Sequence, residues 1–225
     1  LNSTGLFYVM NITEFKALVA GYANRSVASF VRDDGTDILL IAINEAKREG
    51  QLEHDFAATL VDGFITTGVD GAELSTTVTT YGGATALDVK KLLRVWQCGG
   101  TGKRLKEVEL QFQGVESRLR PSEDEEDITA KRAWQRGTKL FVTGFGTTAF
   151  LIEVVKWMPD YDASVVTTDF FITRYISWMK LRSLYQLNFY LKEDQRVNIT
   201  QAALREAWDK VMALENNLES NYNLN

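Results

Sequence analysis

The chain has 225 residues, of which 45% are hydrophobic and 24% are charged, and its net charge is −5. This composition is typical of a globular protein with ample material for a core, and the mild acidity argues against an electrostatic grip on nucleic acid. The single cysteine, Cys98, excludes an internal disulfide and a zinc site built from several cysteines.

The first part of the chain predicts two helices. Asn11 opens the first, with Glu14 three residues later as a capping-box partner. Thr36 or Asp37 starts the second, which runs to about His54 with apolar residues at helical spacing.

The residues before Met10 are interpreted either as an upstream extension or as an ordered arm. The opening segment, LNSTGLFYVM, has neither a basic region nor a small-residue cleavage site, so it does not predict a secretory signal. Leu1 and Met10 both remain candidates for the first residue of the protein.

From about residue 57 to 158 the pattern changes to β-branched or alternating runs separated by glycine-containing turns. The segment Ala86–Trp96 fits either a short helix or a strand. The region after Arg136 predicts a hairpin that turns at Gly144–Gly146. The predicted strands are Leu60–Thr67, Leu74–Thr80, Leu105–Gln113, Lys139–Thr143 and Phe150–Trp157.

Helices resume in the last part of the chain. Asp169–Leu191 is apolar around nearly its whole circumference, which predicts a central helix buried partly against other subunits. Three cations within it argue against a membrane span, since each costs about 2.5–3.5 kcal/mol at mid-membrane. A final amphipathic helix runs from Asn198 or Thr200 to about Asn217.

The predicted fold class is therefore α+β: a helical bundle layer with a β-rich, hairpin- or sandwich-like insertion. One domain, 1–225, contains a helical layer (about 11–56 and 169–218), the insertion (about 57–158) and a flexible tail (about 216–225).

No motif predicts catalysis, a cofactor or a metal. The segment GGTGKR at 99–104 fails the phosphate-loop pattern twice, because Gln97 replaces a glycine and Arg104 replaces serine or threonine. His54 is the only histidine, and its position near a helix C-terminus predicts a capping or surface role.

Three segments together resemble a known family. The first is the helix-to-strand run ILLIAINEAKREGQLEHDF, the second is RGTKLFVTGFGTTAFLIEVVKWMPDYDASVVTTDFF, and the third is YLKEDQRVNITQAALREAWDKVMAL. Their order resembles the head-to-tail adaptor proteins of tailed bacteriophages, including the tail-tubular or gatekeeper ring proteins of short-tailed phages. The matching positions are Arg48, Glu49, His54, Asp55 and Phe56 at the helix end, Arg136, Gly137 and Leu140 at a strand opening, and Trp157 and Pro159 after a late strand.

This resemblance implies a homo-oligomeric ring of about twelve copies. The ring would dock below the portal protein, contact a downstream tail or nozzle protein, and pass viral DNA without sequence-specific binding. The protein would lie in the neck of the virion, and in the host cytoplasm during assembly, with no membrane partner. The hypothetical portal-binding residues are Asn216, Asn217, Leu218, Tyr222 and Leu224.

An acidic loop is expected to face the channel or the surface, where its charge would repel DNA phosphates. Its residues are Glu123, Asp124, Glu125, Glu126 and Asp127.

Three alternatives stay open: another ring of the phage neck or tail (a stopper or a tail terminator), a generic binding module, and an enzyme with dispersed acidic residues.

Overall fold

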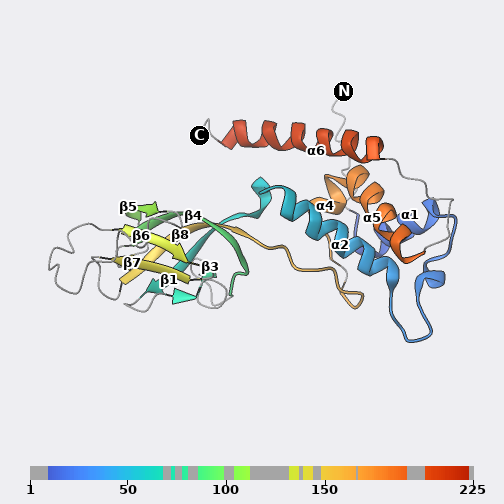
Figure 1. Cartoon of the computed structure of the whole chain (residues 1–225), viewed down its shortest axis with the longest axis horizontal. Helices are drawn as coiled ribbons and strands as arrows, with labels where there is room; N and C mark the ends of the chain where they lie inside the picture. The colour runs from blue at the N-terminus through green and yellow to red at the C-terminus, as the bar shows by residue number, and fades with distance from the viewer. Residues whose placement is uncertain are drawn as a thin grey trace, which may run out of the picture. The chain divides into compact units, whose positions relative to one another are not determined.

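The computed structural model describes residues 10–67, 72–73, 78–80, 86–98, 104–111, 132–136, 139–143, 148–165, 167–191 and 201–222. It divides the chain into two compact units. The helical unit comprises Leu1–Ala58 and Pro159–Asn225, and the β unit comprises Thr59–Met158. The fold class is α+β, as predicted, with the β unit inserted between the two parts of the helical unit (Figure 1).

The helical unit is built from segments at both ends of the chain. Its N-terminal part contains α1 (Ile12–Tyr22), the 3-10 turn η1 (Val27–Phe30) and α2 (Ile38–Glu53), and the short turn η2 (Ala57–Thr59) leads out of it. Its C-terminal part contains α4 (Phe170–Thr173), α5 (Ile176–Tyr190) and α6 (Gln201–Tyr222).

The predicted caps of the first two helices are confirmed. The Asn11 side chain accepts from the Glu14 N–H (3.0 Å) and the Glu14 carboxylate accepts from the Asn11 N–H (2.9 Å). Asp37 caps α2 by accepting from the Leu40 N–H (3.0 Å). Each cap satisfies amide groups that the first helical turn leaves without an internal partner.

The prediction of one continuous helix over Asp169–Leu191 is wrong. Asp169 caps the single turn α4, the chain bends at Arg174 and Tyr175, and α5 begins at Ile176. The bend turns Tyr175 inward, where its side chain is 3% exposed. The expected burial all round is also incomplete within one chain, because Phe189 is 61% exposed.

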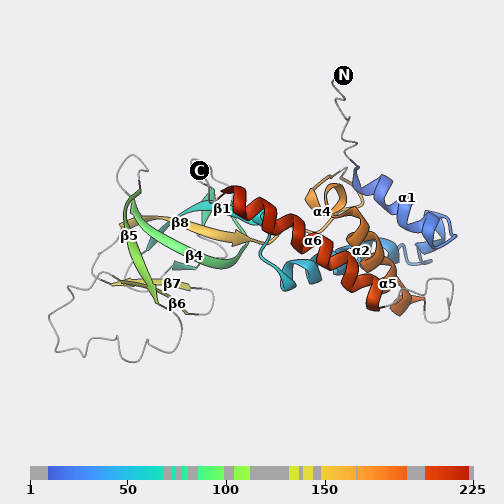
Figure 2. The same ribbon diagram turned by 90° about the horizontal axis from the view of Figure 1, so that it is seen from above.

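Helices α2 and α5 pack side by side and antiparallel, as both ribbon views show (Figures 1 and 2). Tyr190 donates to Glu45 (2.5 Å) at one end of the pair, and Arg182 pairs with Glu49 nearer the other end. The close approach depends on Gly50, where an added Cβ would lie 2.5 Å from the Trp178 ring.

Helix α6 also extends further than predicted. It continues to Tyr222, so residues 216–222 are helical where the sequence predicted a tail. Leu204, Ala207 and Val211 are buried as expected, but Leu214 is 47% exposed and the next residue, Glu215, is fully buried.

The β unit is a single eight-stranded sheet in the order β2-β7-β6-β5-β4-β8-β1-β3. All strand pairs are antiparallel except β5 with β6. The strands are β1 (Leu60–Thr67), β2 (Ala72–Glu73), β3 (Thr79–Thr80), β4 (Val89–Cys98), β5 (Arg104–Gln111), β6 (Arg132–Arg136), β7 (Lys139–Thr143) and β8 (Thr148–Lys156).

One apolar core unites both halves of this sheet. Ile65 from β1, Phe150 and Ile152 from β8 and Leu140 from β7 are buried in the same cluster, although β7 and β8 are four places apart in the strand order. The sheet therefore coils so that distant strands face one another across the core.

Two sequence predictions in this unit are resolved. The ambiguous segment Ala86–Trp96 forms most of strand β4, which begins at Val89. The predicted hairpin at Gly144–Gly146 is wrong, because β7 pairs with β6 and β8 pairs with β1 and β4. The β6–β7 pair has Arg136 opposite Lys139, so only two residues connect these strands, which is the commonest hairpin connection.

Candidate functional site

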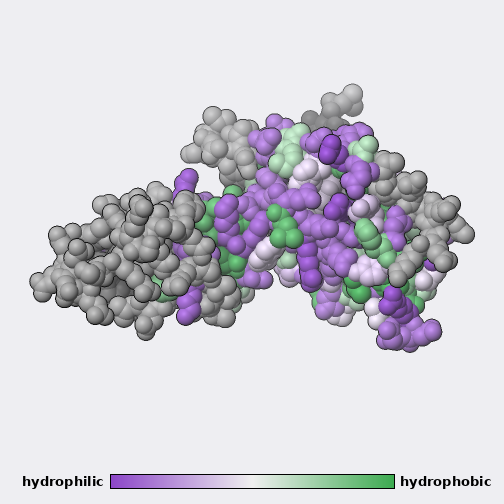
Figure 3. Space-filling model, viewed as in Figure 1, coloured by the Kyte–Doolittle hydropathy of each residue, from purple (hydrophilic) through white to green (hydrophobic). Residues whose placement is uncertain are grey.

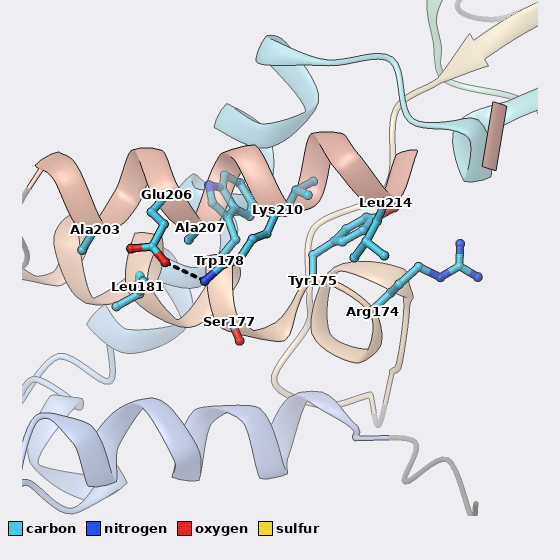
Figure 4. Close-up of a pocket in the computed structure, with 11 residues that line it drawn as sticks. Arg174, Tyr175, Ser177, Trp178, Leu181, Ala203, Glu206, Ala207, Lys210 and Leu214 are labelled. Atoms are coloured by element: carbon cyan, nitrogen blue, oxygen red, sulfur yellow. Dashed lines mark hydrogen bonds and ion pairs between the residues drawn. The ribbon is translucent and has the colours of Figure 1, made fainter. Parts of the chain in front are cut away.

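A groove of about 360 Å³ lies between α5 and α6 in the helical unit. It begins at the bend between α4 and α5 and follows the two helices (Figure 4). Its lining residues are Arg174, Tyr175, Ser177, Trp178, Leu181, Ala203, Glu206, Ala207, Lys210, Val211 and Leu214.

The lining is apolar along its length. The buried Trp178, Ala207 and Val211 contribute to its floor, and Leu214, which is 47% exposed, contributes to one wall. The small residues Ala203 and Ala207 stand one helical turn apart on α6, so their side chains leave room for an occupant above them.

Three charged residues, Arg174, Glu206 and Lys210, also line the groove (Figure 4). Lys210 donates to Glu206 (2.7 Å), and this hydrogen bond lowers the pKa of the Glu206 carboxyl below its usual value. Both side chains are 71% exposed. Arg174 is exposed at the other end, and within the described part of the chain its guanidinium has no ion-pair partner. The groove therefore combines an apolar floor with a few charged groups, which is the usual make-up of a binding groove.

Glu215 anchors α6 beside this groove. The carboxylate is fully buried and accepts from the Ala57 N–H (2.8 Å) and from the Tyr175 hydroxyl. His54, the C-cap residue of α2, places Nε2 3.8 Å from the same carboxylate. One side chain of α6 thus joins the end of α2 to the bend between α4 and α5.

An aromatic cluster surrounds this anchor. The Phe56 ring lies 4.9 Å from Phe171, 5.5 Å from Tyr175 and 6.2 Å from Trp208, measured between ring centroids. Such edge and tilted ring contacts add about 0.5–1.5 kcal/mol each beyond the burial of area. His54 contacts the same Phe56 ring at 5.0 Å, so the predicted capping position of His54 is confirmed but its side chain points into the interior.

A second buried anchor centres on Lys47, which is 2% exposed. Its ammonium lies 2.7 Å from the Asp169 carboxylate, donates to the Pro159 carbonyl (2.7 Å) and stands 3.9 Å from the Tyr161 ring centroid. The Tyr161 hydroxyl donates to the other Asp169 oxygen (2.6 Å).

Burial disfavours the ionised forms of this cluster. It lowers the pKa of Lys47, although the Asp169 carboxylate opposes the shift. Burial and the same carboxylate raise the pKa of Tyr161 well above its usual value of 10.0.

The chain that returns from the β unit is fixed to α2 by three residues at helical spacing. Asn44 exchanges two hydrogen bonds with the Tyr161 backbone (2.8 and 3.0 Å), and Lys47 binds the Pro159 carbonyl. Arg48 binds Asp160 through two nitrogens in an exposed, bidentate pair.

The structure describes some of the predicted site residues and not others. Asn216, Asn217 and Leu218 lie on the last turns of α6, where both asparagines are exposed and Leu218 is half-buried. Tyr222 is the last residue of α6. Leu224 and the acidic loop Glu123–Asp127 lie outside the described residues.

Sequence reasoning missed the two buried anchors. Glu215 stands at the fourth position of the stripe formed by Leu204, Trp208 and Val211, so an acid in an otherwise apolar stripe was the available signal. Lys47 gave no comparable signal, because its partners follow more than a hundred residues later.

Other kinds of site have no support in the described residues. No cluster of three or more histidine, cysteine, aspartate or glutamate side chains that could hold a metal occurs among them. The described helices include none with the length and apolarity of a membrane span. No family model matches the sequence, and a search of curated proteins finds no significant match.

Proposed function

We propose that this chain is a structural protein of a tailed bacteriophage: a head-to-tail adaptor that forms a ring below the portal, contacts the next tail component and surrounds the path of the DNA. Such a protein works in the neck of the virion and assembles in the host cytoplasm. It performs no catalysis and lets the viral DNA pass without sequence-specific binding.

The observation that carries this proposal is structural: positions at which the sequence matches the adaptor pattern make packing contacts in the helical unit. Arg48 and Pro159 make two of the contacts that fix the chain returning from the β unit to α2. Glu49 forms an ion pair with Arg182 that joins α2 to α5. His54 caps α2, and Phe56 is the fully buried centre of the aromatic cluster. Five of the ten matching positions thus take part in packing within the helical unit, and this common role supports the resemblance.

The surface of the helical unit supports a partner-binding role. In the view of Figure 3 its described surface is mostly hydrophilic, with small separate apolar areas. Leu52 and Phe189 are 69% and 61% exposed, and Tyr22 is 57% exposed. Exposed residues of this size on an amphipathic framework are suited to head-to-tail contacts between copies, which close into rings when the rotation permits.

The decisive test is the native mass of the purified chain, alone and after mixing with the portal ring of the same phage. We expect a ring-sized complex that contains both proteins. A chain that stays monomeric in the presence of the portal would contradict the proposal. A ring that does not bind the portal would instead favour a stopper or tail-terminator ring.

A pair of variants separates ring contacts from folding. Phe189→Asp places a charge on the exposed face of α5, whereas Val165→Asp places one at a 50% exposed position of the connector before α4. We expect the first variant to lower the fraction of ring at equal protein concentration and the second to leave it unchanged. Both should unfold at the denaturant concentration of the unmodified chain.

A further inference from the structure

The α6 side of the groove carries both a protruding apolar side chain and a recess that can accept one. Leu214 lines the groove and is 47% exposed. Earlier on the same face of α6, Ala203, Glu206, Ala207 and Lys210 stand at positions i, i+3, i+4 and i+7. Four residues at this spacing form a hole that accepts one side chain from a facing helix, and the two alanines leave this hole open.

The protruding residue and the hole lie at opposite ends of the groove. Leu214 is near the bend between α4 and α5, whereas Ala203 and Glu206 lie toward the other end (Figure 4). A twofold axis between the two features therefore superposes each of them on its complement. When two α6 helices lie antiparallel, each Leu214 meets the hole of the other copy, as an isologous contact requires.

The charges of the groove follow the same symmetry. Arg174 lies at the Leu214 end, and its guanidinium has no ion-pair partner within the described part of the chain. Glu206 borders the hole and binds Lys210 through Oε1 alone, so its second carboxylate oxygen can accept from a cation. The antiparallel arrangement brings Glu206 of the partner subunit to the Leu214 end, and the twofold axis repeats this pairing with Arg174 once in each direction.

We propose that the α5–α6 groove is a docking surface for a second copy of this chain, with the two α6 helices packed antiparallel. Leu214 of each copy enters the hole of the other, and Arg174 pairs with Glu206 of the partner subunit. Such a contact turns its two copies in opposite directions, so it cannot join neighbours in a ring whose copies all point the same way. The dimer is thus distinct from the proposed ring, and the inference does not depend on the proposed function.

The first measurement is sedimentation equilibrium of the full chain over a range of concentrations. The contact involves about three turns of each α6, which is less than a standard interface of about 1,200–2,000 Å² contains. We therefore expect a reversible dimer with a Kd between about 10 μM and 1 mM.

A matched pair of substitutions on adjacent residues of α6 tests the apolar part of the contact. Leu214→Asp charges the protruding residue, whereas Ala213→Asp charges an exposed position that does not line the groove. We expect Leu214→Asp to raise the Kd of the dimer at least about a hundredfold, because a twofold contact contains each substitution twice, and Ala213→Asp to leave it unchanged. Circular dichroism verifies that both variants are folded.

A charge reversal tests the pairing of the two copies. Arg174→Glu and Glu206→Arg should each raise the Kd about tenfold, and the double variant should return it to within about threefold of the unmodified chain. Arg205→Glu is the control, because it reverses a charge at an exposed position of α6 that does not line the groove.

Four results would overturn the proposal. A mass that stays monomeric up to about 1 mM would show that the groove does not bind a second copy. Equal dissociation constants for the two aspartate variants, or no recovery in the double charge reversal, would contradict the antiparallel pairing. A dimer that Phe189→Asp abolishes would lie on another face of α5, whereas the proposed dimer tolerates this change even if the ring does not.

Discussion

The helical unit and the β unit keep their elements in register by different means. In the helical unit, buried polar side chains join segments that are far apart in the sequence: Lys47 binds Pro159 across 112 positions, and Glu215 binds Ala57 across 158. In the β unit, backbone ladders join neighbouring strands, and the described core cluster consists of apolar side chains.

The difference follows from what a shift in register costs. A strand that slips by one residue turns all its core side chains toward solvent, so the alternating pattern of β1 or β8 specifies its own register. A helix can slide or rotate against its neighbour with a smaller change in buried apolar area. A buried charge that has one set of partners removes that freedom, because any other position leaves it unpaired.

The first prediction breaks the Lys47 anchor and has the largest expected effect. Lys47→Met keeps the shape of the side chain but leaves the Asp169 carboxylate, which is 8% exposed, without its cation. We expect a loss of about 3–5 kcal/mol in the free energy of unfolding of the helical unit, measured by urea unfolding. Hydrogen exchange of the strands β1 and β8 should change little.

A second substitution tests the reason for that loss. Lys47→Met with Asp169→Asn removes both charges, keeps an N-cap for α4 and keeps an acceptor for Tyr161, so it should recover most of the stability. Arg48→Met is the control, since its exposed pair with Asp160 contributes little. Equal stability of Lys47→Met and the unmodified chain would show that the anchor is dispensable.

The second prediction removes the Glu215 anchor. Glu215→Ala leaves the Ala57 N–H and the Tyr175 hydroxyl without their acceptor in a buried site. At about 1–2 kcal/mol for each group, the expected loss is about 2–4 kcal/mol. Exchange should accelerate most in α6 and around the α4–α5 bend.

Glu206→Ala is the matched control for Glu215→Ala, because it removes the same residue type from the same helix at a 71% exposed position. It should leave the unfolding midpoint unchanged. If both glutamate variants behaved alike, the buried carboxylate would have no special role in positioning α6.

The third prediction applies one substitution to both units. An added Cβ would lie 2.5 Å from the Trp178 ring at Gly50 and 2.7 Å from Val78 Cγ1 at Gly63. Each Gly→Ala variant should lose about 1–3 kcal/mol, Gly50→Ala in the helical unit and Gly63→Ala in the β unit. Gly21→Ala in α1, where nothing lies within 4 Å, should gain about 0.5–1 kcal/mol. Hydrogen exchange assigns each change to its unit, and a change spread over both units would mean that they unfold together.

The same contrast explains how much the sequence could predict. The alternating pattern predicted the bounds of β1 and β7 as the structure has them, and capping residues predicted the starts of α1 and α2. These features depend on residues close together in the chain. The pairing of β7 with β6 instead of β8 could not be read from local patterns, because Gly137 and Gly144 both signal turns.

The groove and its anchors depend on distant residues. The bend at Tyr175 lies where its hydroxyl meets a carboxylate on α6, forty positions away. The local sequence has apolar residues on every side of a helix and no proline or glycine, so it predicts one straight helix. The partners of Lys47 also lie more than a hundred residues away, so no local pattern marks it as buried. The groove between α5 and α6 follows from that bend, so the candidate site could not be predicted without the tertiary contacts.

The fourth prediction uses pH to follow the Lys47 cluster and has the smallest expected effect. Burial beside Asp169 raises the pKa of Tyr161 above 10.0, so the folded chain keeps the hydroxyl protonated at pH values where the unfolded chain has lost this proton. The folded state then binds more protons, and the stabilisation, complete below pH 10.0, declines as pH rises above it. Tyr161→Phe cannot titrate and retains Lys47, so the lysine cancels from the comparison of the two chains. The difference in unfolding free energy between the unmodified chain and Tyr161→Phe should fall by about 1.4 kcal/mol for each pH unit above 10. A constant difference from pH 8 to 11 would mean that Tyr161 ionises as readily in the folded chain as in the unfolded one, and that this anchor is open to water.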